Sequence, residues 1–273
     1  MPAIISRILV FVFGSIIGSF LNVCIYRMPR QESILWPRSR CPHCQKKIPG
    51  YDNIPFLSYL LLGGRCRFCK ARISLRYPLV ELLTAAMLLS FFNRFGLTYD
   101  FFVYSLFGCG LVVATFVDFA ERIIPDEISI GGIILGFILS SIRGVSTGPL
   151  HFDPRPMFDS FMGIIVGAGI IYIISFFFDL VYFRLLKKPA IQGETASMGA
   201  GDIKFLAMIG AFLGWPKAIF VFFTAPLLGL IFGLLNFIFR KDRLVPYGPF
   251  LALAALIALF WADKIIAVLT RGL

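Results

Sequence analysis

Two aspartates beside apolar segments are the side chains in this sequence best placed to do chemistry. Asp118 closes one apolar run, and Asp202 ends the segment Met198-Gly199-Ala200-Gly201-Asp202, directly before another run. A carboxylate at the edge of hydrocarbon is costly, so its presence calls for an explanation. Two carboxylates a few ångströms apart share one proton. The ionised one can deprotonate a water while the protonated one binds a peptide carbonyl, which is the chemistry of aspartic proteolysis.

Simpler structural roles stay open for the same segment. Asp202 could cap the helix that follows it, where the helix dipole favours negative charge, and Asp126 also looks like a cap because it opens an apolar run. Lys204 could pair with a carboxylate or with the phosphate of a membrane lipid, or it could anchor the chain on the positive side of the membrane. Gly199 and Gly201 permit backbone conformations closed to other residues, so we expect them to turn the chain at Asp202.

A second cluster consists of two matching cysteine pairs separated by 21 residues: Cys41-Pro-His-Cys44 and Cys66-Arg-Phe-Cys69. Each pair is typical of one zinc knuckle, and four thiolates close a tetrahedral site. Disulfides are the main alternative, but a reducing cytoplasm argues against them, and a redox pair would not need two knuckles. We predict a structural zinc ion with His43 as a spectator, and we expect Cys24 and Cys109 to be packing residues.

The elements that must position these residues are membrane helices. Of the 273 residues, 58% are hydrophobic and only 15% are charged, which is too apolar for a soluble domain. We predict an all-α polytopic membrane protein of about eight transmembrane helices, with a small cytoplasmic zinc-ribbon-like domain between the first two. The first run is too long for a cleavable signal peptide, and no Ala-x-Ala-like site follows it. The first expected span is about 4–26, and the second begins near residue 77. The other six are about 101–119, 128–142, 161–183, 203–215, 218–239 and 249–269.

Three domains follow from this pattern: residues 1–26 as the first transmembrane helix, 27–76 as the four-cysteine domain, and 77–273 as the transmembrane part that carries both aspartates. The span at 203–215 is too short to cross a bilayer without help.

The positive charge gathers in one loop. The net charge is +11, and residues 27–76 hold 11 Lys/Arg against two acidic residues. A nucleic-acid surface is one explanation, but between membrane spans the positive-inside rule is the better one, so we expect no nucleic-acid partner. Eight alternating spans then place 19 of the 26 Lys/Arg inside and both termini outside. The same count puts Asp118, Asp202 and the cysteine loop on the cytoplasmic side.

From the residues alone, two other classes of function stay open. A transporter or channel could use Asp118 and Asp202 to bind protons or cations, and a scaffold could use the zinc domain only for docking. Glu81 lies within reach of Arg76, and a structural ion pair between them is expected. No glycine-rich phosphate-binding loop is found, because Gly199-Ala200-Gly201 lacks the strand-turn-helix context.

Short motifs spread over nearly the whole chain form a specific combination. They are Gly18-Ser19-Phe20-Leu21-Asn22-Val23, Tyr26-Arg27-Met28-Pro29, Arg40-Cys41-Pro-His-Cys44, Asn53-Ile54-Pro55, Gly64-Arg65-Cys66-Arg-Phe-Cys69, Arg76-Tyr77-Pro78-Leu-Val-Glu81, Asp118 with Ile124-Pro125-Asp126, Met198-Gly-Ala-Gly-Asp202-Ile-Lys204, and Tyr247-Gly248-Pro249-Phe250. In this combination the chain resembles the bacterial type IV prepilin peptidases, also called prepilin leader peptidase/N-methyltransferases, which belong to the GxGD class of membrane aspartic proteases.

The resemblance implies a bacterial inner-membrane enzyme of type IV pilus or type II secretion systems. Such enzymes remove a basic leader from prepilins and pseudopilins after a glycine, and many methylate the new N-terminal residue with S-adenosylmethionine. Asp118 and Asp202 would be the catalytic pair. The resemblance further implies two groups of supporting residues. Gly199, Gly201, Lys204 and Asp126 would support catalysis, and Gly18, Asn22 and Glu81 would be linked to methylation.

One position departs from the family pattern. Some members carry a second acidic residue two positions after the first catalytic one, where this chain has Ala120. The four cysteines are intact, which favours the bifunctional form over a peptidase-only enzyme.

Overall fold

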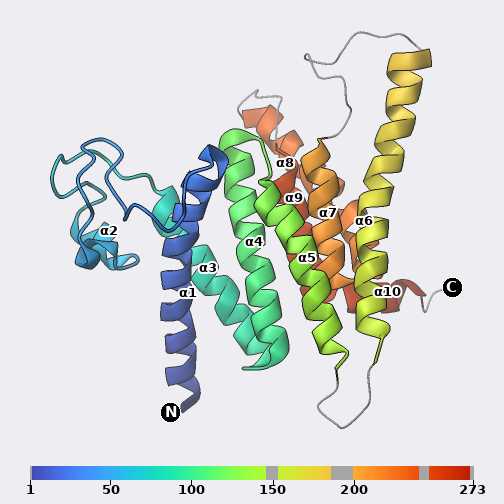
Figure 1. Cartoon of the computed structure of the whole chain (residues 1–273), viewed down its shortest axis with the longest axis horizontal. Helices are drawn as coiled ribbons and strands as arrows, with labels where there is room; N and C mark the ends of the chain where they lie inside the picture. Colours follow the sequence, from blue (N-terminus) through green and yellow to red (C-terminus); the bar gives the residue numbers. More distant parts are fainter. Residues whose placement is uncertain (1, 146–152, 186–198, 240–245, 271–273) are drawn as a thin grey trace. The chain divides into compact units, whose positions relative to one another are not determined.

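The described chain is helical almost throughout. A computed structural model (Figure 1) describes residues 2–145, 153–185, 199–239 and 246–270. Its α-helices are α1 (Pro2–Arg27), α2 (Leu57–Leu61), α3 (Arg76–Phe95), α4 (Tyr99–Glu121), α5 (Asp126–Arg143), α6 (Arg155–Asp179), α7 (Ala200–Leu213), α8 (Trp215–Phe239), α9 (Gly248–Ile257) and α10 (Asp263–Thr270). A π-helical turn (Leu180–Leu185) extends α6, and another (Ala258–Ala262) joins α9 to α10. No strand forms among these residues, so the predicted all-α class is confirmed.

Six helical segments of the described chain are long and apolar enough to cross a bilayer: Ile4–Arg30, Arg76–Phe95, Tyr99–Glu121, Arg155–Tyr182, Trp215–Leu234 and Gly248–Val268. The protein is therefore a multi-pass membrane protein. Helices α5 and α7 are not among these six, so the count of eight spans stays a prediction. The polar stretch before Asp202, including Met198, and the basic residues 240–243 lie outside the described residues.

The chain divides into two compact units, Met1–Val117 and Asp118–Leu273. In the first unit, α1 packs along α3 (Figure 1). A Cβ atom built on Gly14 would lie 2.8 Å from Ala85 Cα, and one built on Gly18 would lie 2.6 Å from Glu81 Cα. Small residues one turn apart thus let the two helix backbones approach closely.

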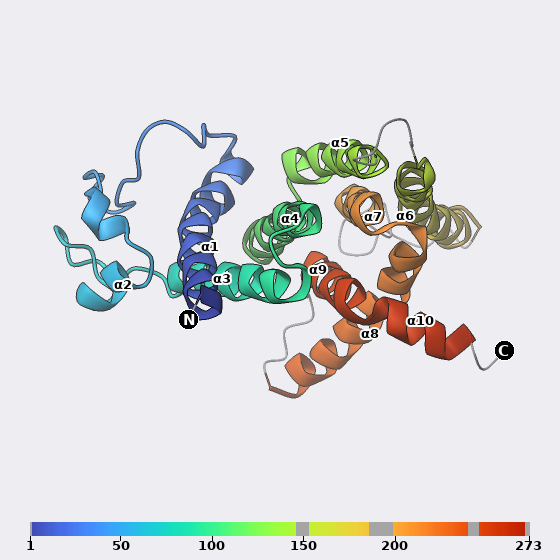
Figure 2. The ribbon, with the colours of Figure 1, turned by 90° about the horizontal axis from the view of Figure 1, so that it is seen from below.

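Helix α7 is the core of the second unit. Figure 2 shows it between α5, α6 and α9, and it also contacts α8. All nine residues from Phe205 to Leu213 are buried. Because neighbouring helices cover α7, its 14 residues do not have to match the thickness of the bilayer. This explains how a helix too short to span alone can belong to the membrane part of the chain.

Glycines bring α6 against α7 at backbone distance. A Cβ atom on either Gly163 or Gly210 would overlap the carbonyl group of the other residue. The Ser160 hydroxyl donates a hydrogen bond of 2.7 Å to the Ala211 carbonyl oxygen on α7. The position of the helix that begins near Asp202 therefore depends on small residues of α6.

We expect Gly163→Val to destabilise the protein by about 3 kcal/mol, because the new side chain must push α6 away from α7. Gly169→Val is the matched control, since a Cβ atom at Gly169 on the same helix meets no atom within 4 Å. Thermal unfolding of both variants in detergent measures the difference. Equal melting temperatures for the two variants would show that the close approach at Gly163 is not needed.

Candidate active site and metal centre

Asp118 lies in the last turn of α4 and is held by a backbone amide. The helix ends because Arg122 adopts a left-handed conformation (φ 56°), with its N–H bonded to the Asp118 carbonyl oxygen at 3.0 Å. The Asp118 side chain is buried, and its Oδ2 accepts a hydrogen bond of 2.9 Å from Gly248 N at the start of α9. No role was predicted for Gly248, because a main-chain donor leaves no side-chain signal in the sequence.

Asp202 lies in the first turn of α7 but does not cap it. The N-cap residue is Gly199, whose carbonyl oxygen accepts the Asp202 N–H at 3.1 Å. Asp126 is likewise not a cap, because Pro125 occupies that position of α5. The capping roles considered for the two aspartates are therefore wrong. Their carboxylates still lie in first turns, where the helix dipole favours negative charge.

The structure brings Asp118 and Asp202 together, although 83 positions separate them in the sequence. The side chain of Ile124 lies close both to Gly201, the neighbour of Asp202, and to Gly248, whose N–H binds Asp118. A Cβ atom on Gly201 would lie 3.5 Å from Ile124 Cβ, and one on Gly248 would lie 3.3 Å from Ile124 Cδ1. The two carboxylates are close enough for their charges to repel one another. Such a pair favours sharing one proton over ionising twice.

The expected role of the two glycines before Asp202 is wrong in its conformational detail. Gly199 has φ −66° and ψ 137°, and Gly201 lies within α7, so neither adopts a conformation reserved for glycine. A Cβ atom on Gly199 would lie 3.6 Å from Asp202 Oδ2. The absence of a side chain there leaves that side of the carboxylate uncovered.

Lys204 and Asp126 form an ion pair between α7 and α5. Lys204 Nζ lies 2.7 Å from Asp126 Oδ1 and 2.9 Å from Oδ2. Of the roles considered for Lys204, pairing with a carboxylate is the one observed. The pair holds the first turn of α7, and hence Asp202, against the first turn of α5.

We expect Gly248→Ala to lower any activity of the aspartate pair by about 10-fold or more, because small displacements of reacting groups are costly. The added methyl group would lie 2.7 Å from Asp118 Oδ2 and would push the carboxylate off its amide donor. Gly233→Ala is the control, because a Cβ atom there meets nothing within 4 Å. The turnover rates of both variants provide the test. Full activity of Gly248→Ala would show that the hydrogen bond from Gly248 N to Asp118 is not needed.

The four cysteines of the first unit meet in one cluster. Their sulfur atoms all lie within 4.8 Å of one another, and Cys41 Sγ is 3.8 Å from Cys69 Sγ. Four sulfurs placed about 2.3 Å from a tetrahedral zinc ion would be about 3.8 Å apart. Backbone N–H groups of Cys69 and Phe68 lower the pKa of the Cys66 thiol to about 6, whereas desolvation and the neighbouring cysteines raise the pKa of Cys69 to about 11, as expected of thiols that share one negative charge. The donor set therefore fits a zinc-type metal ion.

The two knuckles have the same backbone design. Cys41 N bonds to Lys46 O at 3.0 Å, and Cys66 N bonds to Ala71 O at 2.8 Å. The residue after each second cysteine, Gln45 or Lys70, is left-handed with φ 57° and 58°. His43, Cys24 and Cys109 do not belong to the metal-binding cluster found in the described residues.

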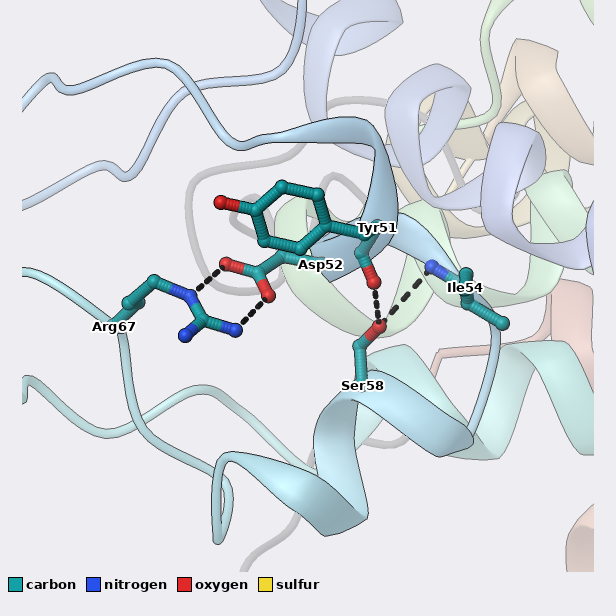
Figure 3. Close-up of polar contacts among 5 residues, drawn as sticks. All are labelled: Tyr51, Asp52, Ile54, Ser58 and Arg67. Atoms are coloured by element: carbon teal, nitrogen blue, oxygen red, sulfur yellow. Dashed lines mark hydrogen bonds and ion pairs between the residues drawn. The ribbon is translucent and has the colours of Figure 1, made fainter.

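An ion pair ties the second knuckle to the segment before α2 (Figure 3). Arg67 Nε and Nη2 donate to Asp52 Oδ2 and Oδ1 at 2.7 and 2.6 Å. In the first turn of α2, the Ser58 hydroxyl accepts the Ile54 N–H and donates to the Tyr51 carbonyl oxygen. These contacts connect the metal-binding loops to α2.

The Asp52–Arg67 pair predicts a pH dependence. The hydrogen bond and charge of Arg67 lower the pKa of Asp52. The pair therefore stabilises the domain above the ordinary aspartate pKa, and this contribution is lost as the pH falls through the lowered pKa. Arg67 is half-exposed, so solvent screens the pair and limits its contribution to stability. A carboxyl NMR titration should find the Asp52 pKa below the ordinary value, and Arg67→Met should restore that value. An unchanged pKa in Arg67→Met would contradict the assignment.

Gly18, Asn22 and Glu81 also lie together, where α1 crosses α3. Asn22 Nδ2 donates to Gly18 O at 3.3 Å and to Tyr77 O at 3.1 Å, while the buried Asn22 Oδ1 has no partner. Glu81 accepts the Phe56 N–H at 3.0 Å and a hydrogen bond from Ser19.

Neutral donors thus hold Glu81, and the expected ion pair with Arg76 is wrong. The guanidinium of Arg76 lies over the ring of Tyr77 instead, and its Nε has no hydrogen-bond partner. Phe56 has the unfavourable φ of 57°, which its hydrogen bond to Glu81 helps to stabilise.

The fold and the site define a multi-pass helical membrane protein with two neighbouring carboxylates, the arrangement expected of a membrane aspartic peptidase. Residues 105–234 match the Type IV leader peptidase family, and residues 12–95 match the Bacterial Peptidase A24 N-terminal domain. The chain belongs to the type IV leader peptidase family. The first match contains Asp118 and Asp202, and the second contains the four cysteines.

Curated relatives support this assignment over most of the chain. A protein of Aeromonas salmonicida (strain A449) named Prepilin leader peptidase/N-methyltransferase is 34% identical over 94% of this chain and 91% of its own length. Proteins of the same name from Pseudomonas putida and Legionella pneumophila are 32% and 31% identical, over 94% and 95% of this chain and 91% and 92% of their own lengths. No solved structure matches the chain significantly.

Proposed function

We propose that this protein removes the basic leader from type IV prepilins or pseudopilins, after a glycine, with Asp118 and Asp202 as the catalytic pair. The observation that carries the proposal is the meeting of these two buried or half-buried carboxylates from α4 and α7. Family membership and the names of the relatives support the choice of substrate.

The surroundings of the two carboxylates favour different roles. The Gly248 N–H donates a hydrogen bond to Asp118 Oδ2 and so stabilises a carboxylate there, and we assign to Asp118 the role of taking a proton from the attacking water. Asp202 holds the shared proton and donates a hydrogen bond to the scissile carbonyl. The ion pair between Lys204 and Asp126 keeps Asp202 in position. Gly199 has no side chain to cover the Asp202 carboxylate, which leaves the carboxylate accessible.

The position of the pair argues against the transporter alternative. Asp118 lies in the last turn of α4, and Asp202 lies in the first turn of α7. Carboxylates at helix ends suit a cut at the membrane boundary, whereas a cation pathway calls for groups near the bilayer midplane. A pilin precursor offers its cut site at such a boundary, between a basic leader and an apolar helix.

The second activity that we propose is N-methylation of the new N-terminal residue, with S-adenosylmethionine as methyl donor. The Asn22 Oδ1 without a partner and the Glu81 carboxylate are two buried acceptors beside Gly18, and such acceptors suit an ammonium group. Both the methyl donor and the new N-terminus carry one. A peptidase-only enzyme is the alternative, and the intact four-cysteine domain favours the bifunctional form.

The four cysteines would hold a structural Zn²⁺ ion, and all four positions of the tetrahedron would then be filled by sulfur. The metal would fix the fold of residues 27–76 and would not act in either reaction. Family membership supports a bacterial inner membrane location, and the excess of Lys/Arg in this loop supports an orientation with the zinc domain and the aspartates in the cytoplasm and both termini in the periplasm.

One assay tests both activities. The purified full chain is incubated with a prepilin, with and without S-adenosylmethionine, and the products are identified by mass spectrometry. We expect cleavage after the glycine in both samples, and one added methyl group only when the donor is present. Absence of cleavage overturns the proposal, and cleavage without methylation favours the peptidase-only enzyme.

A further inference from the structure

Tyr247 carries a buried hydroxyl group that has no hydrogen-bond partner. Buried polar atoms are nearly always paired, so each exception needs an explanation. Among the described residues, the other three such atoms belong to Asn22, Arg76 and Ser105 in the first unit. Within the described part of the unit that contains both aspartates, the Tyr247 hydroxyl is the one such atom.

The backbone of Tyr247 is fixed at the site. Its carbonyl oxygen accepts the N–H groups of Phe250 and Leu251 at 3.0 and 3.2 Å, which starts α9. The next residue, Gly248, donates its N–H to Asp118 Oδ2. A single dipeptide therefore binds Asp118 through the Gly248 amide and carries a hydroxyl group without a hydrogen-bond partner on Tyr247.

The side chain of Tyr247 also lies near Asp202. Burial and the charge of Asp202 raise the pKa of Tyr247 to about 12. The phenol is therefore protonated at any pH at which the enzyme would work, and it can act only as a neutral hydrogen-bond donor or acceptor. No bond between Tyr247 and Asp202 occupies it.

We propose that the Tyr247 hydroxyl donates a hydrogen bond to the scissile carbonyl oxygen of the prepilin, beside the Asp118–Asp202 pair. This inference rests on the proposed peptidase function. When water adds to the carbonyl carbon, the carbon–oxygen π electrons move onto that oxygen, which Tyr247 stabilises without giving up its proton. Asp118 takes the proton of the water, and Asp202 protonates the same oxygen. When the C–N bond breaks, Asp118 gives its proton to the leaving amine, and Asp202 takes back a proton from a hydroxyl of the tetrahedral intermediate as the new carboxyl group forms.

Tyr247→Phe removes only the hydroxyl group. We expect kcat for prepilin cleavage to fall by about 100-fold, with KM changed by less than about 3-fold, because the bond strengthens as charge develops. The melting temperature should stay equal or rise, because no internal hydrogen bond is lost. Tyr172→Phe on α6 is the control, since Tyr172 is 59% exposed, and it should cleave like the unmodified protein.

Three outcomes overturn the assignment. Tyr247→Phe could cleave at the unmodified rate, or it could raise KM alone, or it could lose activity together with melting temperature, which would indicate a structural role. In each case the proposed function stands as long as the unmodified protein cleaves. An unmodified protein that cleaves no prepilin overturns both proposals.

Discussion

Asp118→Asn and Asp202→Asn should each lower prepilin cleavage by about 10⁴-fold while leaving the protein folded. An amide can neither take a proton from water nor share one with a neighbouring carboxylate. The fold should persist because an asparagine at position 118 still offers an oxygen to the Gly248 N–H. Cleavage rates and melting temperatures of the purified variants provide the test.

The matched control for these two variants is Asp263→Asn. Asp263 lies on α10 and pairs with Lys217 in an exposed ion pair, so this substitution removes one carboxylate of the same unit away from the pair. We expect near-normal cleavage. A rate above about one tenth of normal in either active-site variant would rule that aspartate out as a catalytic group.

Replacing one cysteine of the metal-binding cluster should abolish zinc binding. We expect Cys66→Ala to reduce the zinc content from about one ion per chain to nearly none, because three thiolates no longer close the tetrahedron. The loss should also unfold the loops around the knuckles, since binding of a structural zinc ion contributes about 10 kcal/mol to folding. Elemental analysis and amide hydrogen exchange of residues 40–73 measure the two effects.

Cys109→Ala is the control for the zinc experiment, because Cys109 lies on α4 and is not part of the cluster. Its zinc content should equal that of the unmodified protein. Unmodified protein purified in reducing buffer without zinc would contradict the metal assignment. A separate comparison of methylation and cleavage by Cys66→Ala would indicate which activity needs the domain.

The metal cluster was the part of the molecule easiest to predict from sequence. Its geometry is local, because two residues between cysteines and a left-handed residue after each pair suffice to build a knuckle. The helices were predictable for a similar reason, since long apolar runs have few alternatives in a membrane. Helix α7 was also expected, as a short span at 203–215, but its burial was not predictable because it depends on contacts with α5, α6, α8 and α9.

The aspartate site was predictable only in part. The cost of a carboxylate in apolar surroundings drew attention to Asp118 and Asp202, but the amide donor at Gly248 lies 130 residues from Asp118 and has no side chain. Lys204 and Asp126 are 78 residues apart, so the sequence alone did not show that Lys204 forms an ion pair rather than a membrane anchor. The glycines before Asp202 were expected to allow a special backbone conformation, whereas Gly199 leaves space beside the carboxylate.

The cleavage rate of the double variant Asp118→Asn/Asp202→Asn tests the central claim most directly, because it asks whether the two carboxylates work as one unit. Groups that share one proton fail together, so removing the second should cost little beyond removing the first. We predict that the double variant cleaves prepilin as slowly as either single variant, to within about 3-fold. Losses that multiply, with the double variant slower by the product of the two single effects, would contradict the account.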